Sequence, residues 1–316
     1  MPDDRPATSP SRRDWLRSAL GACLIATTGR AEGPTRDDAA EVEALAKKAG
    51  LGEFGRTETS HFLGLGDAPS AFRAEALSAC EAMSTEFLIH FRDRGFADLA
   101  MPKRKLVVVI LADSRSYAAY AGVDRNLVIG GHFELDTNRL VMFDFRADQA
   151  SVNTAAQLVN TFTLIHETTH QLTFNTGLLD LRADVPLCVS EGLATYGEVW
   201  RPKGRARVGQ VNRPRLIGLP KPRRDGTTWL PLSRLLVEDD LLKAEVTQQA
   251  AYAQSWIFIH SHMKSAERLP KLRAYLATIA GRRDKSHRLD DARAHLGDLD
   301  KLDVELKRYV TRPIGA

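Results

Sequence analysis

TFTLIHETTHQLTFNTG, residues Thr161–Gly177, is the stretch from which both the fold and the chemistry of this sequence are read. It contains the pattern H-E-x-x-H at residues 166–170. Residues four apart on an α-helix lie one turn apart on the same face, so His166 and His170 can reach one metal ion. Glu167 follows the first ligand, where its carboxylate can activate a water instead of binding the metal. The stretch therefore predicts a buried metal-binding helix, and its final glycine is a typical residue for ending one.

A second stretch supplies a candidate third ligand, because a catalytic zinc site takes three protein ligands and keeps one position open. PLCVSEGLATYGE lies downstream at residues 186–198. Pro186 is placed to begin a second helix, and Asp184 could cap it. Glu191 then falls in the first turns of that helix, and the short loop 178–185 lets the helix fold back beside the first. The sequence predicts two histidines and this glutamate as the ligand set.

These two stretches resemble the gluzincin zinc metallopeptidases. More narrowly, the sequence resembles the peptidase-MA-like domain and the exported bacterial family called domain of unknown function 1570. The resemblance extends over most of the chain from about Ser60 onward, through His61–Leu63, Val107–Ile110, Tyr117–Tyr120, Gly130–Phe133, Asn138–Val141 and Tyr252–Trp256. Cys188 departs from the family, which more often has a bulky aromatic residue there, and the ligands are unchanged by this departure. The resemblance implies a zinc hydrolase fold and leaves the substrate open.

The chain as a whole predicts an α+β fold, in which a small mixed sheet is followed by the two metal helices and a helical C-terminal half. The valine-rich run 105–111 is typical of a buried strand, and residues 128–135 and 139–145 predict a hairpin. We also expect a strand at 60–65 and helices at 38–49, 70–92, 114–121, 232–242, 246–264, 269–280 and 299–310. In gluzincins an edge strand holds extended peptide substrate. Residues 130–133 are the candidate for that edge, although their paired glycines could equally mark a bulge or a bend.

We divide the sequence into an export signal, a variable segment and one catalytic domain, at residues 1–31, 32–58 and 59–316. Within the domain we expect a sheet half, the metal helices, a basic loop and a helical half, at residues 59–150, 151–200, 201–231 and 232–316. The basic loop contains nine lysines and arginines but only one acidic residue, Asp225. It is interpreted either as solvated surface or as a flap that recruits an anionic or carboxylate-bearing substrate.

The N-terminal segment resembles a twin-arginine export signal at SRRDWL, residues 11–16, with tryptophan in place of the usual phenylalanine. An apolar stretch follows at 18–28, and then a small-residue cleavage site that ends at Ala31. The stretch is too short for a membrane span, so we do not expect an integral membrane protein. LGAC, residues 20–23, resembles a lipoprotein cleavage box, but no adequate apolar region precedes Cys23. We therefore expect export by the twin-arginine machinery to the periplasm or cell exterior, without a lipid anchor.

Charge and cysteine content narrow the class of protein further. The whole chain has a formal net charge of +4 at pH 7. Residues 1–31 contain five arginines and three aspartates, a net +2, which leaves +2 for the rest of the chain. Such a small net positive charge does not indicate a general nucleic-acid-binding surface. A disulfide between Cys80 and Cys188 would suit an exported protein, but two packed thiols are the simpler interpretation.

The ligand set predicts zinc, because two imidazoles and a carboxylate suit zinc better than magnesium or calcium. Zinc lowers the pKa of its water towards about 7, and Glu167 is placed to take the proton as general base. The oxyanion that develops during hydrolysis needs a second electrophile besides the metal. Tyr252 is the first candidate, from its place in the family-like stretch 252–256, and a packed aromatic ring is the equal alternative. Tyr196 is the second candidate.

Four further residues could support the site. Thr195 and Glu198 could orient a metal-bound histidine, because such ligands usually donate their other N–H to a protein group. His260 and His262 lie on the same predicted helix as the candidate tyrosine, and one of them could face the cleft, although histidines that are exposed or satisfied in the core are the commoner case.

The sequence as a whole predicts an exported zinc metallohydrolase, specifically a peptidase that acts on a peptide or protein substrate. The alternative is a binding module that keeps the fold and the zinc but recognises peptide or glycan without turnover. Glu167 favours the enzyme, because a structural zinc site does not need this residue and usually closes its fourth position.

Overall fold

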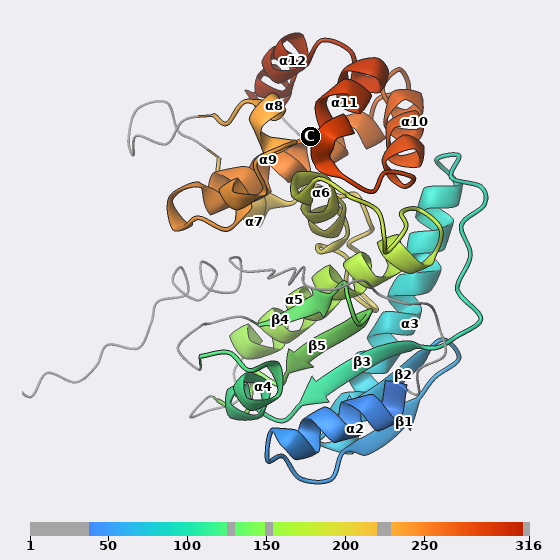
Figure 1. The fold of residues 1–316 in the computed structure, drawn as a ribbon, viewed down its shortest axis with the longest axis vertical. Helices are drawn as coiled ribbons and strands as arrows, with labels where there is room; N and C mark the ends of the chain where they lie inside the picture. Colours follow the sequence, from blue (N-terminus) through green and yellow to red (C-terminus); the bar gives the residue numbers. More distant parts are fainter. Residues whose placement is uncertain (1–37, 125–129, 149–153, 220–228, 312–316) are drawn as a thin grey trace, which may run out of the picture.

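The computed structural model describes residues 38–124, 130–148, 154–219 and 229–311. Within these ranges the protein is α+β, with a five-stranded mixed sheet followed by a helical C-terminal half (Figure 1). The predicted fold class is therefore confirmed. The predicted export signal and Cys23 lie outside the described residues.

The sheet has the strand order β1-β2-β3-β5-β4, with the valine-rich strand at its centre. β3 (Leu106–Leu111) is buried along its whole length and pairs in parallel with β2 (Phe62–Gly66) and β5 (Arg139–Phe143). The two edge strands, β1 (Gly55–Glu58) and β4 (Gly131–Glu134), each pair antiparallel with their neighbour. A strand that is covered on both faces has a continuous apolar sequence, which is why β3 could be located without a structure.

The predicted hairpin is confirmed as β4 and β5, and β4 is an edge strand as expected. The connecting loop contains Asn138 with a φ of 57°, a left-handed conformation that asparagine tolerates better than most residues. The start of the predicted strand 128–135 lies outside the described residues. β1 was not expected, because its sequence GRTE contains no apolar run. It is a strand because its main chain pairs with that of β2.

Helices cover both faces of the sheet and divide its side chains between two cores. α3 (Ser70–Arg92) and α5 (Thr154–Asn175) pack on one face, where Val108 and Ile110 belong to the larger core. The other face is covered by two helices, α2 (Asp38–Lys48) and α4 (Ser114–Ala121). Neighbouring side chains of β3 therefore enter different cores, as the period of two along a strand requires. All four of these helices lie where the sequence predicted them.

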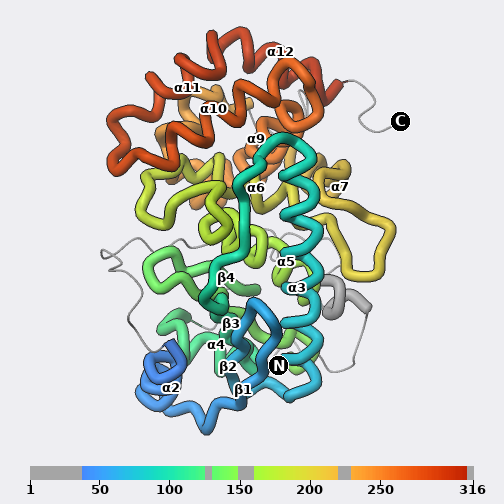
Figure 2. Tube along the Cα trace, turned by 90° about the vertical axis from the view of Figure 1, so that its right-hand side faces the viewer, coloured from blue at the N-terminus to red at the C-terminus, as the bar shows by residue number. Residues whose placement is uncertain are grey.

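α3 and α6 (Leu187–Gly197) lie where the sheet half and the helical half meet, as Figure 2 shows. α6 packs between α5 and α9 (Glu245–Met263). The remaining helices are α7 (Arg213–Leu216), α8 (Leu232–Leu235), η1 (Asp239–Leu242), α10 (Leu269–Ile279), η2 (Lys285–His287), α11 (Arg288–Leu296) and α12 (Leu299–Thr311). Among the helices that the structure describes, none combines the length and the apolar character needed to cross a bilayer.

Two segments of the helical half differ from the prediction. The single helix expected at 232–242 is divided into α8 and η1, and α11 was not expected from its polar sequence. A tertiary ion pair accounts for both differences. Arg288, the first residue of α11, is buried and donates to both oxygens of Asp184, at 2.7 and 2.9 Å. It also donates to Asp239 at 2.8 Å, which positions η1.

Asp184, which the sequence suggested as the cap of α6, does not cap this helix. Asp184 is engaged with Arg288, and the N–H of Leu187 instead donates to Asp239 Oδ1 at 3.0 Å. Burial by itself raises the pKa of Asp239, but the bonds from Arg288 and the Leu187 N–H outweigh it and lower that pKa. A residue far along the chain therefore caps the helix that carries the third metal ligand.

Cys80 and Cys188 are both free and buried, which confirms the interpretation as packed thiols. Cys80 on α3 lies 3.3 Å from the hydroxyl of Thr168 on α5. Cys188 occupies the first turn of α6.

The substitution Arg288→Met should lower the free energy of unfolding by about 3–5 kcal/mol, because Asp184 loses its guanidinium partner and Asp239 keeps only Lys285 as a cation. The exposed Arg293→Met on the same helix should change it by less than about 0.5 kcal/mol. Since the pKa of Asp239 is lowered by folding, its contribution is complete above about pH 4 and is lost as the pH falls through the folded value. Thermal denaturation across pH should therefore show the difference from wild type shrinking in acid. A difference independent of pH would contradict this role for Asp239.

Candidate metal centre

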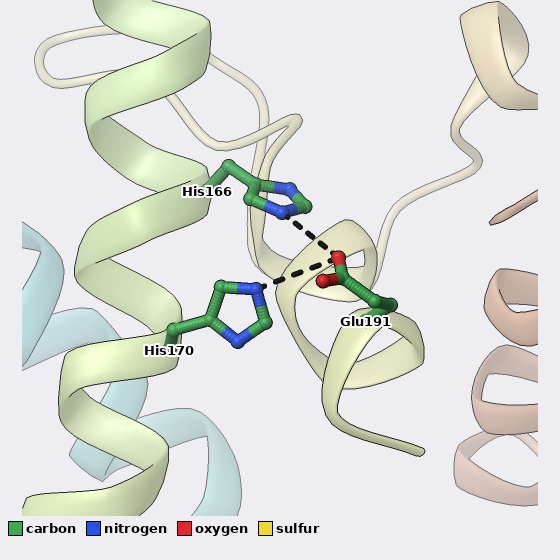
Figure 3. Close-up of side chains that lie close together, drawn as sticks. All are labelled: His166, His170 and Glu191. Atoms are coloured by element: carbon green, nitrogen blue, oxygen red, sulfur yellow. Dashed lines mark hydrogen bonds and ion pairs between the residues drawn. The ribbon is translucent and has the colours of Figure 1, made fainter. Parts of the chain in front are cut away.

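The three predicted ligands come together in the structure (Figure 3). His166 and His170 lie one turn apart on α5, and Glu191 faces them from α6. One ligand atom from each residue lies within 4.8 Å of the others, and all three side chains are buried. α5 ends at Asn175, and Gly177 beyond it has a φ of 94°, so the predicted glycine stop is confirmed.

The spacing of the ligand atoms fits a small metal ion. Glu191 Oε2 lies 3.2 Å from His166 Nε2 and 3.5 Å from His170 Nε2. Bonds of about 2.0–2.2 Å in tetrahedral geometry place ligand atoms about 3.4 Å apart. In the described part of the chain, His170 Nε2 and Glu191 Oε1 are buried without a hydrogen-bond partner. Since buried polar atoms are normally satisfied, these two atoms indicate that the group could hold a metal ion.

Each histidine is oriented through its other ring nitrogen. His166 Nδ1 lies 2.8 Å from Glu198 Oε2, and His170 Nδ1 lies 3.1 Å from the hydroxyl of Ser190. Both arrangements direct Nε2 towards the centre. The predicted contact of Glu198 is therefore present. The one predicted for Thr195 is wrong, because its hydroxyl donates to the main-chain oxygens of Glu191 and Gly192.

Glu198 is itself held by an arginine from the basic loop. Arg215 donates through Nε to Oε1 at 2.7 Å and through Nη2 to Oε2 at 2.9 Å. Asn212, which caps the short helix α7, also donates to this carboxylate. Arg215 is buried, so neither interpretation of the loop, as solvated surface or as a flap, describes this residue. Nothing in the local sequence separated it from the eight other basic residues of the loop.

The charges of the centre favour an imidazolium when the metal is absent. Burial by itself lowers the pKa of His166, but its bonds to Glu191 and Glu198 raise it to about 10. The pKa of Glu198 is lowered, since Arg215 and His166 together outweigh its burial. A metal ligand must be a neutral imidazole, so metal binding displaces a proton from His166. Affinity for metal should therefore rise with pH across the neutral range.

Glu167 and Tyr252 both lie beside the triad. Glu167 is buried, and its charge helps to raise the pKa of His166. The ring of Tyr252 on α9 is also buried, with its centroid 6.5 Å from that of His166. Arg215 covers this ring, with Cζ 4.6 Å from its centroid. The candidate general base and the first candidate for the second electrophile thus both lie next to the triad.

The remaining candidates are engaged elsewhere. The hydroxyl of Tyr196 lies 2.9 Å from His90 Nε2 on α3, so the second candidate electrophile is directed away from the triad. His260 Nδ1 lies 2.8 Å from the hydroxyl of Tyr309. His262 donates from Nδ1 to the main-chain oxygen of Phe258 at 2.7 Å. Both histidines are therefore buried and hydrogen-bonded in the core, which is the commoner of the two cases considered for them.

The edge strand β4 lies directly against the metal helix. A Cβ atom built on Gly130 would lie 2.8 Å from Thr163 Oγ1, and one on Gly131 would lie 3.0 Å from Thr163 Cγ2. Phe133 stacks on His170, with ring centroids 6.4 Å apart and ring planes 10° apart. The nearest atoms to these built Cβ atoms are Phe145 Cζ for Gly130, at 2.5 Å, and the main-chain oxygen of Val141 for Gly131, at 2.9 Å. Close packing against Phe145, β5 and α5 together therefore explains the paired glycines, and it places an edge strand beside the candidate metal ligands.

Residues 160–283 match the model of a family described as Protein of unknown function (DUF1570). This range begins on α5 before the first histidine and extends beyond α10, so it contains the triad, Glu198, Arg215 and Tyr252. The match confirms the resemblance to this family over these residues. A comparison with curated proteins finds no match.

The substitution Arg215→Met should weaken zinc binding about 10–100-fold, because Glu198 would lose the bonds that hold it against His166. Titration of the metal-free protein in competition with a chelator measures this change. Arg213→Met removes the same charge from an exposed position in α7 and should leave the affinity unchanged. Equal affinities in the two variants would mean that Arg215 does not position the ligand.

Proposed function

We propose that the protein is an exported zinc-dependent metallohydrolase, specifically a peptidase with Glu167 as its general base. The observation that carries this proposal is a buried His-His-Glu triad with a second acidic residue, Glu167, beside its first histidine. A purely structural zinc site has no use for that residue. Zinc is the metal that best suits two imidazoles and one carboxylate. The twin-arginine-like segment at residues 11–16 supports export.

Zinc held by His166, His170 and Glu191 would supply Lewis-acid chemistry, by lowering the pKa of a water and polarising the substrate carbonyl. The carboxylate of Glu167 accepts the proton of the attacking water and then delivers it to the departing amine. Glu198 keeps the ring of His166 in one orientation throughout, because both of its oxygens are bound by Arg215.

A peptide is the substrate class that the edge of the sheet supports. Among the strands that the structure describes, β4 is paired on one side only, and an extended peptide can add to the other side through main-chain hydrogen bonds. Because β4 packs against α5 through Thr163 and His170, a peptide bound in this way would pass close to the triad. Tyr252, on the opposite side of His166 from the sheet half, is the residue that we propose stabilises the developing oxyanion.

The substitution Glu167→Gln should retain one zinc per chain and lower hydrolysis of a peptide library about 10²–10⁴-fold, because general-base assistance is lost. His166→Ala should lose the zinc, and Glu191→Gln should weaken its binding. The exposed His287→Ala should retain both zinc and activity. Elemental analysis and a mass-spectrometric digest measure the two properties separately. Near-normal hydrolysis by Glu167→Gln would contradict the mechanism, and a zinc-loaded wild type that binds peptides but cleaves none would identify a binding module.

The substitution Tyr252→Phe removes only a hydroxyl and keeps the ring beneath Arg215. We expect unchanged zinc content, a similar melting temperature and a fall in kcat of about a hundredfold, with KM little altered. Steady-state kinetics on one cleaved peptide give both constants. An unchanged kcat would leave Tyr252 as a packed aromatic residue, and a large fall in melting temperature would mark its hydroxyl as a structural hydrogen bond.

A further inference from the structure

The guanidinium groups of two arginines lie over the ring of Phe162, which is one helical turn before the candidate ligand His166. The Cζ atoms of Arg201 and Arg215 each lie 5.7 Å from the centroid of its ring. Residues 162, 166 and 170 share one face of α5, so the aromatic ring and the two histidines form a continuous row. One turn of helix corresponds to about 5.4 Å along its axis, which places both cations close to the candidate metal centre.

The two arginines differ in their partners. Arg215 is buried and has its own carboxylate, because it binds both oxygens of Glu198. Arg201 is partly exposed and donates from Nη1 to the main-chain oxygens of Glu198 and, at 2.7 Å, of Trp200. Within the described ranges, Arg201 forms no salt bridge, and its Nε and Nη2 make no hydrogen bond.

Arg201 is therefore a cation that is partly removed from water and has no anionic partner among the residues that the structure describes. Burial lowers its pKa, and the charge of Glu198 opposes this effect. That carboxylate is already shared between His166, Asn212 and Arg215. A guanidinium in such a position is well suited to bind a carboxylate through two parallel hydrogen bonds.

We propose that Arg201, seated over Phe162, binds a carboxylate group of the peptide substrate. This inference rests on the proposed peptidase function and names the class of peptide it acts on. Two residues of an extended chain span about 6.6 Å, which is similar to the one helical turn between Phe162 and His166. Because Arg201 Cζ lies a further 5.7 Å from the centroid of Phe162, the carboxylate lies within about two to four residues of the bond that is cleaved. It is supplied either by the C-terminus of a short peptide or by an acidic side chain.

Binding and cleavage of matched peptide pools test the proposal. Three pools of N-acetylated hexapeptides share the same randomised neutral positions. One pool ends in a free carboxylate, one ends in an amide, and one ends in an amide but contains a single glutamate. Binding is measured on zinc-loaded Glu167→Gln protein, and cleavage on wild type. At least one carboxylate-bearing pool should bind about tenfold or more tightly than the neutral amide pool, and the pool that does so identifies the source.

Variants of the basic loop assign this preference to one side chain. In the Glu167→Gln protein, the further substitution Arg201→Gln should remove the preference for carboxylate-bearing peptides. Arg201→Lys should retain part of this preference, because the positive charge remains but the planar guanidinium with its parallel donors is lost. Arg205→Gln, at an exposed position of the same loop, should leave it intact. Zinc content and melting temperature show whether each variant is folded. Retention of the full preference in Arg201→Gln would overturn the proposal.

The outcomes separate this proposal from the proposed function. Equal binding of all three pools, or binding of none, overturns the carboxylate site. Equal cleavage of the three pools by wild type also overturns it and leaves the peptidase intact. A preference in binding that depends on Arg201, without cleavage of any pool, keeps the carboxylate site and rejects the peptidase.

Discussion

The buried carboxylate of Glu198 is the interaction on which the rest of the site depends. It ends α6, orients His166 on α5 and is neutralised by Arg215 from α7. The two metal helices and the basic loop are thus joined at one charged group. A buried carboxylate costs several kcal/mol unless it is paired and hydrogen-bonded, so each of these elements requires the others to be in place. The metal helix is consequently fixed by the helical half as firmly as by the sheet.

Charge balance explains how the centre can be buried without a metal and still be suited to one. Glu167, Glu191 and Glu198 all lie in the interior, and Arg215 forms a salt bridge with Glu198. In the metal-free protein a proton on His166 supplies part of the missing positive charge, which is reflected in its raised pKa. A divalent cation would replace that proton and satisfy the unpaired ligand atoms. Metal binding, protonation and stability are therefore coupled in this protein.

The local sequence determined a large part of the fold and the ligands. The HETTH spacing places two imidazoles on one helical face whatever surrounds it, and the apolar run of β3 can only be accommodated inside a sheet. α3 and α4 begin and end at the residues predicted for them. Glu191 could be assigned because a short loop limits where the second helix can lie. In each case the pattern that carries the prediction lies within a short stretch of the sequence.

The tertiary structure decided what depends on partners far apart in the chain. β1 exists through pairing with β2, and α6 is capped by Asp239 instead of the nearby Asp184. Arg215 and Arg201 are two of nine basic residues in one loop, yet one is buried against Glu198 and the other remains partly exposed over Phe162. An arginine has the same local propensity in either position. Only the location of a carboxylate brought from another element decides which of them supports the metal centre.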